Sequence, residues 1–301
     1  MSSKFMPIFS GGTGRSGTTI VGKLLGKHSQ VKCGKPYEIK FLTDVFSLTD
    51  VAYGMRDFAS GEISKKTEFY LKLFPHKSYE ARMKKFSARM LDNWFERTNR
   101  LGQNSGLHLG ITRKNLKSLL AKLQEEARHD LESAARNFFY GFVNAQRQYK
   151  SEPNWMDTSP PNIMHSASIA RLLPDAKFIE MKRNPLDTIA SVVREPWGPN
   201  NLDDAMQWWL RRTDMAEESL AKIPNNQRLA LKLEDLIIHD RENSYQKLLT
   251  FLGLEDEGPM REYFNNEMLA EKLHENRWKR DFENPEEIED RFAHMSERWW
   301  N

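Results

Sequence analysis

The sequence contains a single cysteine, Cys33, and no long apolar run. One cysteine excludes an intramolecular disulfide and favours a reducing compartment. No stretch approaches the roughly 18 apolar residues of a membrane-spanning helix, and the opening MSSKFMPIF lacks the apolar centre of a secretory signal. We therefore expect a soluble cytoplasmic protein without stable membrane insertion.

The net charge is also low, and the common zinc-binding motifs are absent from the sequence. The formal net charge is only +3, which argues against a protein built to bind nucleic acid. The eight histidines form no His-Glu-x-x-His motif and accompany no cysteine pair, so we expect no structural zinc. The apolar fraction of 39%, with 17 Phe and 8 Trp, instead predicts a packed globular core.

The charge that is present is distributed unevenly. Residues 65–100 contain ten lysines and arginines against four acidic residues, whereas residues 255–301 contain seven against fourteen. A solvated helical face accounts for either stretch, and the basic one also suits an anionic acceptor or surface.

The stretch FSGGTGRSGTT, residues 9–19, differs from a nucleotide-binding P-loop in one respect. Gly12 and Gly17 have the outer glycine spacing of G-x-x-x-x-G-K-[ST] and Thr19 has the hydroxyl position, but Thr18 replaces the lysine. An apolar run precedes the loop and a helical pattern follows it, which is the order that a phosphate-binding loop needs. We predict that the loop binds phosphate through Gly14, Arg15, Ser16, Gly17, Thr18 and Thr19.

Two further strand and helix pairs follow later in the chain. Residues 176–182 predict a strand that leads into a helix, for which Asn184 suits the cap and Pro185 the first position. Residues 228–234 predict another strand, and the helix after it ends at Gly253. Strands that alternate with helices predict an α/β fold, with a P-loop-like parallel β-sheet flanked by helices and the site at the carboxyl ends of the strands.

Arg183 and Ser191 form a second candidate anion site. Arg183 ends the strand at residues 176–182, and its guanidinium matches phosphate oxygens, while Ser191 adds a hydroxyl two turns into the next helix. Arg194 lies on the same helix. An arginine before a helix is often an ordinary ion-pair partner, so the prediction rests on the combination of Arg183 with Ser191. Two anion sites in one α/β domain suggest a ligand with two separate phosphates.

Two other groups of residues are better explained by folding than by chemistry. Glu234 and Asp235 follow a strand, as the acidic residue of nucleotide hydrolases does, but without a P-loop lysine we expect them to start a helix. Trp208 and Trp209 lie in a predicted helix, and we expect one ring in the core and the other exposed rather than a stacking platform.

Taken in order, these blocks resemble the 3′-phosphoadenosine 5′-phosphosulfate (PAPS)-dependent sulfotransferases, particularly their bacterial and tyrosylprotein-sulfotransferase-like branch. The resemblance covers about residues 7–45 and 153–300. It is carried by GTGRSGTT, WMDTSPPN (155–162), LLPDAKFIEMKRNPLDTIASVVRE (172–195), LKLEDLI (231–237) and FLGL (251–254). The chain departs from the family at Leu233, where a tyrosine is common, and at Thr158 and Ser159, near which the family often has a lysine.

The resemblance implies roles for matching residues. The loop with Arg15 would bind the 5′-phosphosulfate, Arg183 and Ser191 the 3′-phosphate, and Lys279 with Arg280 would form an outer clamp. The implied cofactor is PAPS, released as 3′,5′-ADP (PAP), without a metal. Nucleotide kinases need lysine and Mg²⁺ for charge on two phosphates, whereas here Arg15 and the loop donors would stabilise a single leaving phosphate.

Glu38 is the candidate general base that removes the proton of the acceptor. The resemblance implies it, since the family has a glutamate some twenty residues after the loop, although Glu38 is displaced by one or two positions. The alternative, which we favour less, is a surface carboxylate paired with Lys35 or Lys40. The rival bases are His28, at the end of the loop helix, and Asp157.

We expect a single domain over residues 1–301, in which residues 46–150 form a variable helical region with the lid and the acceptor pocket. The acceptor is a small molecule, carbohydrate or peptide, and the basic excess slightly favours an anionic or carbohydrate acceptor over an apolar phenol. The sequence does not predict the oligomeric state. Two other functions stay open, a small-molecule kinase with a degenerate P-loop and a non-catalytic binder of anionic polymers.

Overall fold

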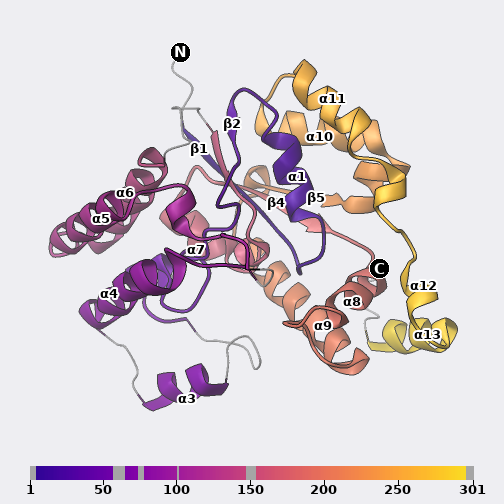
Figure 1. Ribbon diagram of the computed structural model, residues 1–301, viewed down its shortest axis with the longest axis horizontal. Coiled ribbons are helices and arrows are strands. Elements are labelled where there is room, and N and C mark those ends of the chain that lie inside the picture. The colour runs from indigo at the N-terminus through magenta and orange to yellow at the C-terminus, as the bar shows by residue number, and fades with distance from the viewer. Residues whose placement is uncertain (1–4, 57–64, 74–77, 100–101, 147–153, 296–301) are drawn as a thin grey trace.

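The computed structural model describes residues 5–56, 65–73, 78–99, 102–146 and 154–295 (Figure 1). At its centre is a sheet of five parallel strands in the order β2-β3-β1-β4-β5. The strands are β1 (Met6–Gly11), β2 (Val31–Lys32), β3 (Asn154–Asp157), β4 (Lys177–Lys182) and β5 (Arg228–Lys232). The predicted α/β class with a helix-flanked parallel sheet is confirmed.

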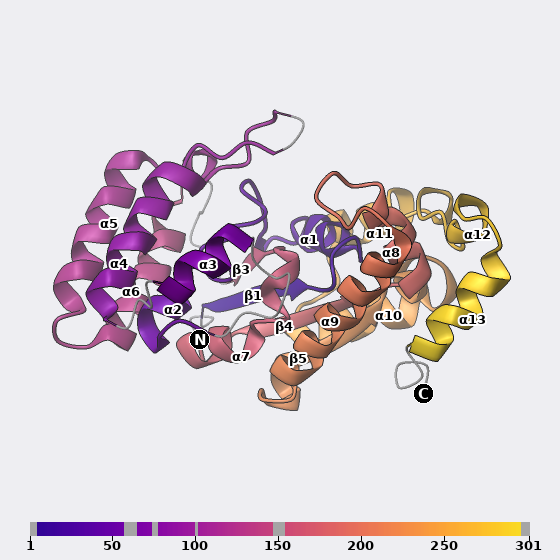
Figure 2. The same ribbon diagram turned by 90° about the horizontal axis from the view of Figure 1, so that it is seen from below.

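Helices cover both faces of this sheet and form the two ends of the molecule (Figure 2). They are α1 (Thr18–Leu25), α2 (Leu48–Tyr53), α3 (Lys65–Leu73), α4 (Tyr79–Ala88), α5 (Arg113–Glu126), α6 (Leu131–Asn144), α7 (Ser166–Leu172), α8 (Pro185–Val193), α9 (Leu202–Leu220), α10 (Arg241–Leu252), α11 (Gly258–Asn266), α12 (Trp278–Asp281) and α13 (Pro285–Met295). Two π-helical turns, Arg89–Trp94 and Asp235–His239, follow α4 and β5. Within the described ranges, no helix is both long and apolar enough to cross a membrane.

The two faces of the sheet have separate apolar layers. Phe9 of β1 and Phe178 of β4 are opposite each other in register, stack at 5.6 Å between ring centroids, and pack with α5, α6 and α7. The alternate residues Ile8 and Ile179 pack on the other face with α1, α10 and α11. Burying each such side chain stabilises the fold by about 1.5–3 kcal/mol, so the two layers hold the strand ends in fixed positions.

The region predicted to be helical, residues 46–150, contains α2 to α6. Its helices α4, α5 and α6 form one end of the elongated molecule, and α12 and α13 form the opposite end (Figures 1 and 2). Phe41, after β2, packs edge-on against Phe142 of α6 at 4.8 Å between ring centroids. Leu116 and Leu120 of α5 are buried in the same layer as Phe9. The helical region and the sheet therefore share a core.

The segments around α8 and α10 agree with the sequence in part. Asn184 caps α8 by accepting from the amide of Asp187, Pro185 opens the helix, and Gly253 ends α10 with a φ of 64°. The helix predicted directly after residues 228–234 is wrong in one respect, because a π-helical turn comes first and the chain breaks at Asp240.

Candidate functional site

The loop after β1 turns tightly over the edge of the sheet. Gly14 and Gly17 have φ values of 99° and 93°, and Arg15 between them has a φ of 58°, which is uncommon for a residue with a side chain. A Cβ on Gly17 would lie 2.6 Å from Leu233, so the loop packs closely against the segment that follows β5. Left-handed backbone at a non-glycine residue is typical of functional loops.

The loop and the start of α1 present hydrogen-bond donors. In the part of the chain that the structure describes, no side chain caps the first turn of α1 and no acidic residue lies in it. Such a turn carries roughly half a positive charge and binds anions readily. The hydroxyl of Ser16 is buried against Gly12 and has no hydrogen-bond partner among the described residues. Because an unpaired buried hydroxyl costs about 1–3 kcal/mol, an acceptor at this position would stabilise the loop.

The two candidate anion sites touch each other. Nε of Arg15 donates to Oγ of Ser191 at 2.9 Å, and Nη1 of Arg183 donates to the main-chain oxygen of Arg15 at 3.1 Å. β1 and β4 are neighbouring parallel strands, so the loop after one and the helix after the other meet at the same edge. The structure thus brings together residues that the sequence had placed in two sites.

Arg183 is held at the junction of β4 and α8. Burial lowers the pKa of its guanidinium, nearby Asp187 and Glu234 oppose that change, and the positive charge of Arg15 adds to it. Its Nε is buried and has no partner within the described ranges. Glu234 accepts from the main-chain nitrogen of Asn184 at 2.9 Å, which fixes the start of α8. Glu234 therefore has a helix-start role, at α8 rather than at the turn that follows it in sequence.

Glu195 also belongs to this site, although the sequence did not predict it. Its Oε1 lies 3.4 Å from Nη1 of Arg15, and its Oε2 accepts from the indole of Trp197 at 3.1 Å. The Arg15 and Glu195 side chains are 47% and 28% exposed, so their ion pair contributes at most about 1 kcal/mol. A carboxylate just after a helix is common, and no motif in the sequence distinguishes Glu195.

The outer basic residues lie on or near α12. Arg194 pairs with Asp281 of α12 at 2.6 Å. Nζ of Lys279 lies 5.3 Å from the ring centroid of the buried Trp278, and Arg280 is exposed. Among the described residues, the structure gives neither Lys279 nor Arg280 a contact with the loop after β1.

Asp187 joins α12 to the site. It is buried, and its carboxylate accepts from the main-chain nitrogens of Asn276 at 2.9 Å and Trp278 at 3.2 Å. Asp187 lies in the first turn of α8. Its carboxylate holds the segment before α12 against the helix that carries Ser191.

Glu38 lies near the end of β3, the strand beside β1. Its neighbour Ile39 donates its main-chain N–H to Asp157 at 2.8 Å, and Asp157 is opposite Phe9 of β1 in register. The carboxylate of Glu38 pairs with Lys40 at 2.8 Å and is 33% exposed. Glu38 is therefore near the same edge of the sheet as the loop after β1, and it makes the ion pair with Lys40 that was the alternative to a role as base.

The two rival bases have structural contacts. Asp157 is buried and accepts from Ile39, from the amide of Ser159 at 3.0 Å and from the side chain of Asn162 at 2.7 Å. Burial raises the pKa of its carboxyl, against these hydrogen bonds. The buried His28 lies beyond the far end of α1, where its Nε2 is 3.0 Å from the carbonyl of Glu255.

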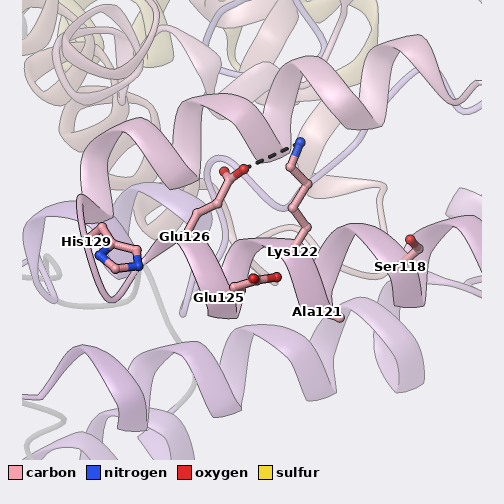
Figure 3. A pocket seen from close by; sticks show the side chains of 6 residues that line it. All are labelled: Ser118, Ala121, Lys122, Glu125, Glu126 and His129. Atoms are coloured by element: carbon pink, nitrogen blue, oxygen red, sulfur yellow. Dashed lines mark ion pairs between the residues drawn. The ribbon is translucent and has the colours of Figure 1, made fainter.

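A hollow of about 580 Å³ lies elsewhere, along the outer side of α5 (Figure 3). It is lined by Ser118, Ala121, Lys122, Glu125, Glu126 and His129. All of these residues come from α5 and the turn that follows it, at the helical end of the molecule (Figure 2). The hollow joins no groups from separate elements. Within the described ranges, no group of three or more histidine, cysteine or acidic side chains is arranged to hold a metal ion.

Comparison with known proteins gives the following likenesses. A family model described as "Sulfotransferase family" matches residues 7–258. The solved structures similar to this chain include sulfotransferase STF1 from Mycobacterium tuberculosis, at 16% identity and a TM-score of 0.49, with 97% of this chain and 77% of that chain covered. The sulfotransferase domain of the Synechococcus PCC 7002 olefin synthase has 14% identity and a TM-score of 0.45, with 89% of this chain and 79% of that chain covered. Retinol dehydratase in complex with androsterone and PAP has 15% identity and a TM-score of 0.42, with 96% of this chain and 78% of that chain covered. A search of the curated proteins found no match.

Proposed function

The chain belongs to the sulfotransferase family, and on that premise we propose that it transfers a sulfuryl group from PAPS to a hydroxyl or amine of an acceptor. The observation that carries the proposal is the meeting of Arg15, Arg183 and Ser191 at one edge of the sheet. Two adjoining anion sites suit a nucleotide with phosphates on both its 3′ and 5′ positions. A nucleoside triphosphate carries all its phosphates in one chain on the 5′ position and has none on the 3′ position to occupy the Arg183 side.

The chemistry of the donors fits PAPS. Ser16 Oγ and Arg183 Nε are buried and have no partner among the described residues, and each would be satisfied by a phosphate or sulfonate oxygen. We assign Gly14 to Thr19 to the 5′-phosphosulfate and Arg183 with Ser191 to the 3′-phosphate. Arg194, Lys279 and Arg280 would form outer contacts with the same nucleotide.

In the proposed reaction, a bond forms between the acceptor oxygen or nitrogen and sulfur, the bond between sulfur and the 5′-phosphate oxygen breaks, and PAP leaves. Arg15 and the main-chain amides of the loop stabilise the negative charge on the leaving phosphate. Glu38 takes the acceptor proton, and Lys40 orients its carboxylate. The leaving group carries a single phosphate at the reacting 5′ position, whereas a kinase must stabilise charge on two adjacent phosphates. We therefore expect the reaction to proceed without a divalent cation.

The acceptor region in this proposal is residues 46–150, within a single domain that spans residues 1–301. The buried side chains of α5 and α6 pack into the same layer as Phe9 and Phe178, which supports one continuous domain. Movement of these helices as a lid would therefore be coupled to the sheet that carries the loop.

Two linked measurements test the proposal. Calorimetry with PAP should give a dissociation constant in the micromolar range, and sulfate transfer from PAPS across a panel of acceptors should proceed equally in EDTA and in Mg²⁺. Folded protein that fails to bind PAP would contradict the proposal. Phosphate transfer from ATP that requires Mg²⁺ would support a kinase, and retention of an anionic polymer by Arg183→Ala without any transfer would support a binding protein.

A further inference from the structure

We propose that Trp197 and Trp208 form a wall for the acceptor beside the loop, and that this acceptor is a carbohydrate whose ring packs on the exposed indole. The inference rests on the proposed function, because it names the acceptor of the same site.

The two indoles border the loop at the residue before Arg15. A Cβ placed on Gly14 would lie 3.5 Å from Cη2 of Trp208 and 3.8 Å from Cη2 of Trp197. The rings of the two tryptophans are 6.1 Å apart between centroids and tilted by 55°. A molecule that reaches the loop from this side therefore meets an aromatic surface directly next to the proposed sulfonate site.

Trp208 is a rigid part of this wall. The guanidinium of Arg212 lies 4.8 Å from its ring centroid, and Nε of Arg212 donates to the main-chain oxygen of Thr13 at 2.6 Å. The adjacent Trp209 is buried against Phe292 at 5.5 Å between ring centroids. The prediction that one tryptophan of this pair packs in the core is thus confirmed. The other is only partly exposed, and it packs on the loop.

Trp197 provides the exposed surface. It is 41% exposed, and the other large apolar side chains of the described ranges with comparable exposure, Phe69 and Leu73, lie on α3. An indole combines a large apolar face with a polar N–H, which makes tryptophan suited to a surface that is partly wet. A ligand that covers this ring would bury apolar surface directly beside the loop.

The carboxylate of Glu195 favours a sugar over an apolar phenol as the acceptor. This carboxylate accepts a hydrogen bond from the indole of Trp197 at 3.1 Å. The carboxylate oxygens of Glu195, which can accept further hydrogen bonds, therefore lie at the edge of the same ring. A sugar can place its C–H face on the indole while its hydroxyls donate to this carboxylate. A phenol with an apolar body would instead remove water from the carboxylate without replacing the lost hydrogen bonds.

Glu195 also connects the two substrates. The same carboxylate contacts Arg15, which we assign to the 5′-phosphosulfate. A bound anion competes for Arg15, and the carboxylate is then available to a sugar hydroxyl. Nucleotide binding therefore strengthens acceptor binding.

The test compares Trp197→Ala and Trp197→Phe with a control, Tyr263→Ala, which removes a partly buried ring of α11 that packs against the layer of Ile8 and Ile179. For each protein, calorimetry measures PAP affinity, ligand-observed NMR measures binding of methyl β-glucoside and lactose to the PAP complex, and transfer assays use both sugars and p-nitrophenol. We expect sugars to bind and accept sulfate, and Trp197→Ala to weaken sugar binding about tenfold or more while PAP affinity is unchanged. Trp197→Phe should retain part of the affinity, and the control should match the parent protein.

The outcomes separate this inference from the proposed function. Protein that binds PAP but neither binds nor sulfates either sugar overturns the carbohydrate wall and leaves the sulfotransferase proposal standing. Sugar binding that is unchanged in Trp197→Ala also overturns it. Parent protein that does not bind PAP contradicts the proposed function, and the inference falls with it.

Discussion

The guanidinium of Arg15 donates a hydrogen bond to the hydroxyl of Ser191 at 2.9 Å, although the two residues are 176 positions apart. The contact depends on two features, the left-handed backbone of Arg15 and the adjacency of β1 and β4. Arg183 also reaches the carbonyl of Arg15, so two positive side chains lie within one small region. Like charges repel, and this arrangement is stabilised when an anion binds between them.

Removal of Arg183 should abolish most nucleotide affinity. A hydrogen bond to a charged group contributes about 1.5–3 kcal/mol, so Arg183→Ala should weaken PAP binding roughly tenfold to a hundredfold. Arg183→Lys should restore only part of it, because lysine lacks the planar fork that matches phosphate. Calorimetry with PAP measures both effects.

The matched control for this prediction is Lys182→Ala. Lys182 is the exposed neighbour of Arg183, and its Nζ lies 3.6 Å from Glu180. If Lys182→Ala lowers PAP affinity as much as Arg183→Ala does, general positive charge attracts the nucleotide and the assignment of Arg183 to the 3′-phosphate is incorrect.

Glu195→Gln should bind PAP more tightly than the parent protein does. The carboxylate competes with the nucleotide for Arg15 at 3.4 Å, and an exposed pair of this kind is worth up to about 1 kcal/mol, which corresponds to at most about a fivefold gain in affinity. Titration with PAP at two ionic strengths measures the gain. Glu218→Gln, an exposed carboxylate on α9, controls for the change in net charge. Weaker binding in Glu195→Gln would mean that the carboxylate positions Arg15 for the nucleotide.

The backbone features of the candidate site were predictable because their signals are local. The glycine spacing around Arg15 and the Asn184-Pro185 start of α8 are short patterns with direct backbone consequences, and the structure has both features. β3 was not predicted as a strand, because a buried segment of four residues has no alternation that would reveal it.

The contacts between these local elements could not be predicted. The hydrogen bond from Arg15 to Ser191 requires β1 and β4 to be neighbours, and a sequence does not give strand order. One ring of Trp208 and Trp209 was expected in the core and the other exposed, yet the ring of Trp208 packs on Gly14, almost two hundred positions earlier. Glu195 had no local signal at all, since its partners, Arg15 and Trp197, are set by tertiary structure.

The buried His165 should make stability fall as the solution becomes acidic. Burial, with Arg56 and Arg212 nearby, lowers the pKa of its imidazole well below 6.5. An unfolded chain takes up a proton near pH 6.5 whereas the folded protein does not, so the free energy of unfolding decreases by up to about 1.4 kcal/mol per pH unit below that value. This contribution is fully present above pH 6.5. Urea unfolding between pH 7.5 and 5 measures the slope.

The comparison for His165 is between two histidine variants. His165→Gln should flatten the acid side of the stability curve, whereas His294→Gln, an exposed residue of α13, should leave the slope unchanged. An identical slope in His165→Gln and the parent protein would show that other groups cause the acid sensitivity.

Asp187→Ala should destabilise the protein and detach the segment before α12. The buried carboxylate accepts from two main-chain amides, and unpaired buried groups cost about 1–3 kcal/mol each, so urea unfolding should show a loss of at least about 1–3 kcal/mol. If Lys279 and Arg280 contact the nucleotide, PAP affinity should fall in Asp187→Ala and also in the double variant Lys279→Ala/Arg280→Ala. Unchanged affinity in the double variant would remove the outer clamp from the proposed site.

Glu38→Gln should lose catalysis while it keeps nucleotide binding and stability. A positioned general base contributes roughly a hundredfold to ten-thousandfold to the rate, so kcat should fall by that factor, and PAP affinity should stay within about twofold because Glu38 is assigned to the acceptor side. Glu262→Gln, an exposed residue of α11, should keep full activity. Asp157→Asn should have the opposite effect. The buried carboxyl of Asp157 accepts hydrogen bonds from Ile39, Ser159 and Asn162, so this substitution should first lower the free energy of unfolding. Activity in Glu38→Gln that equals the parent protein would leave Glu38 as the surface partner of Lys40 and require another base.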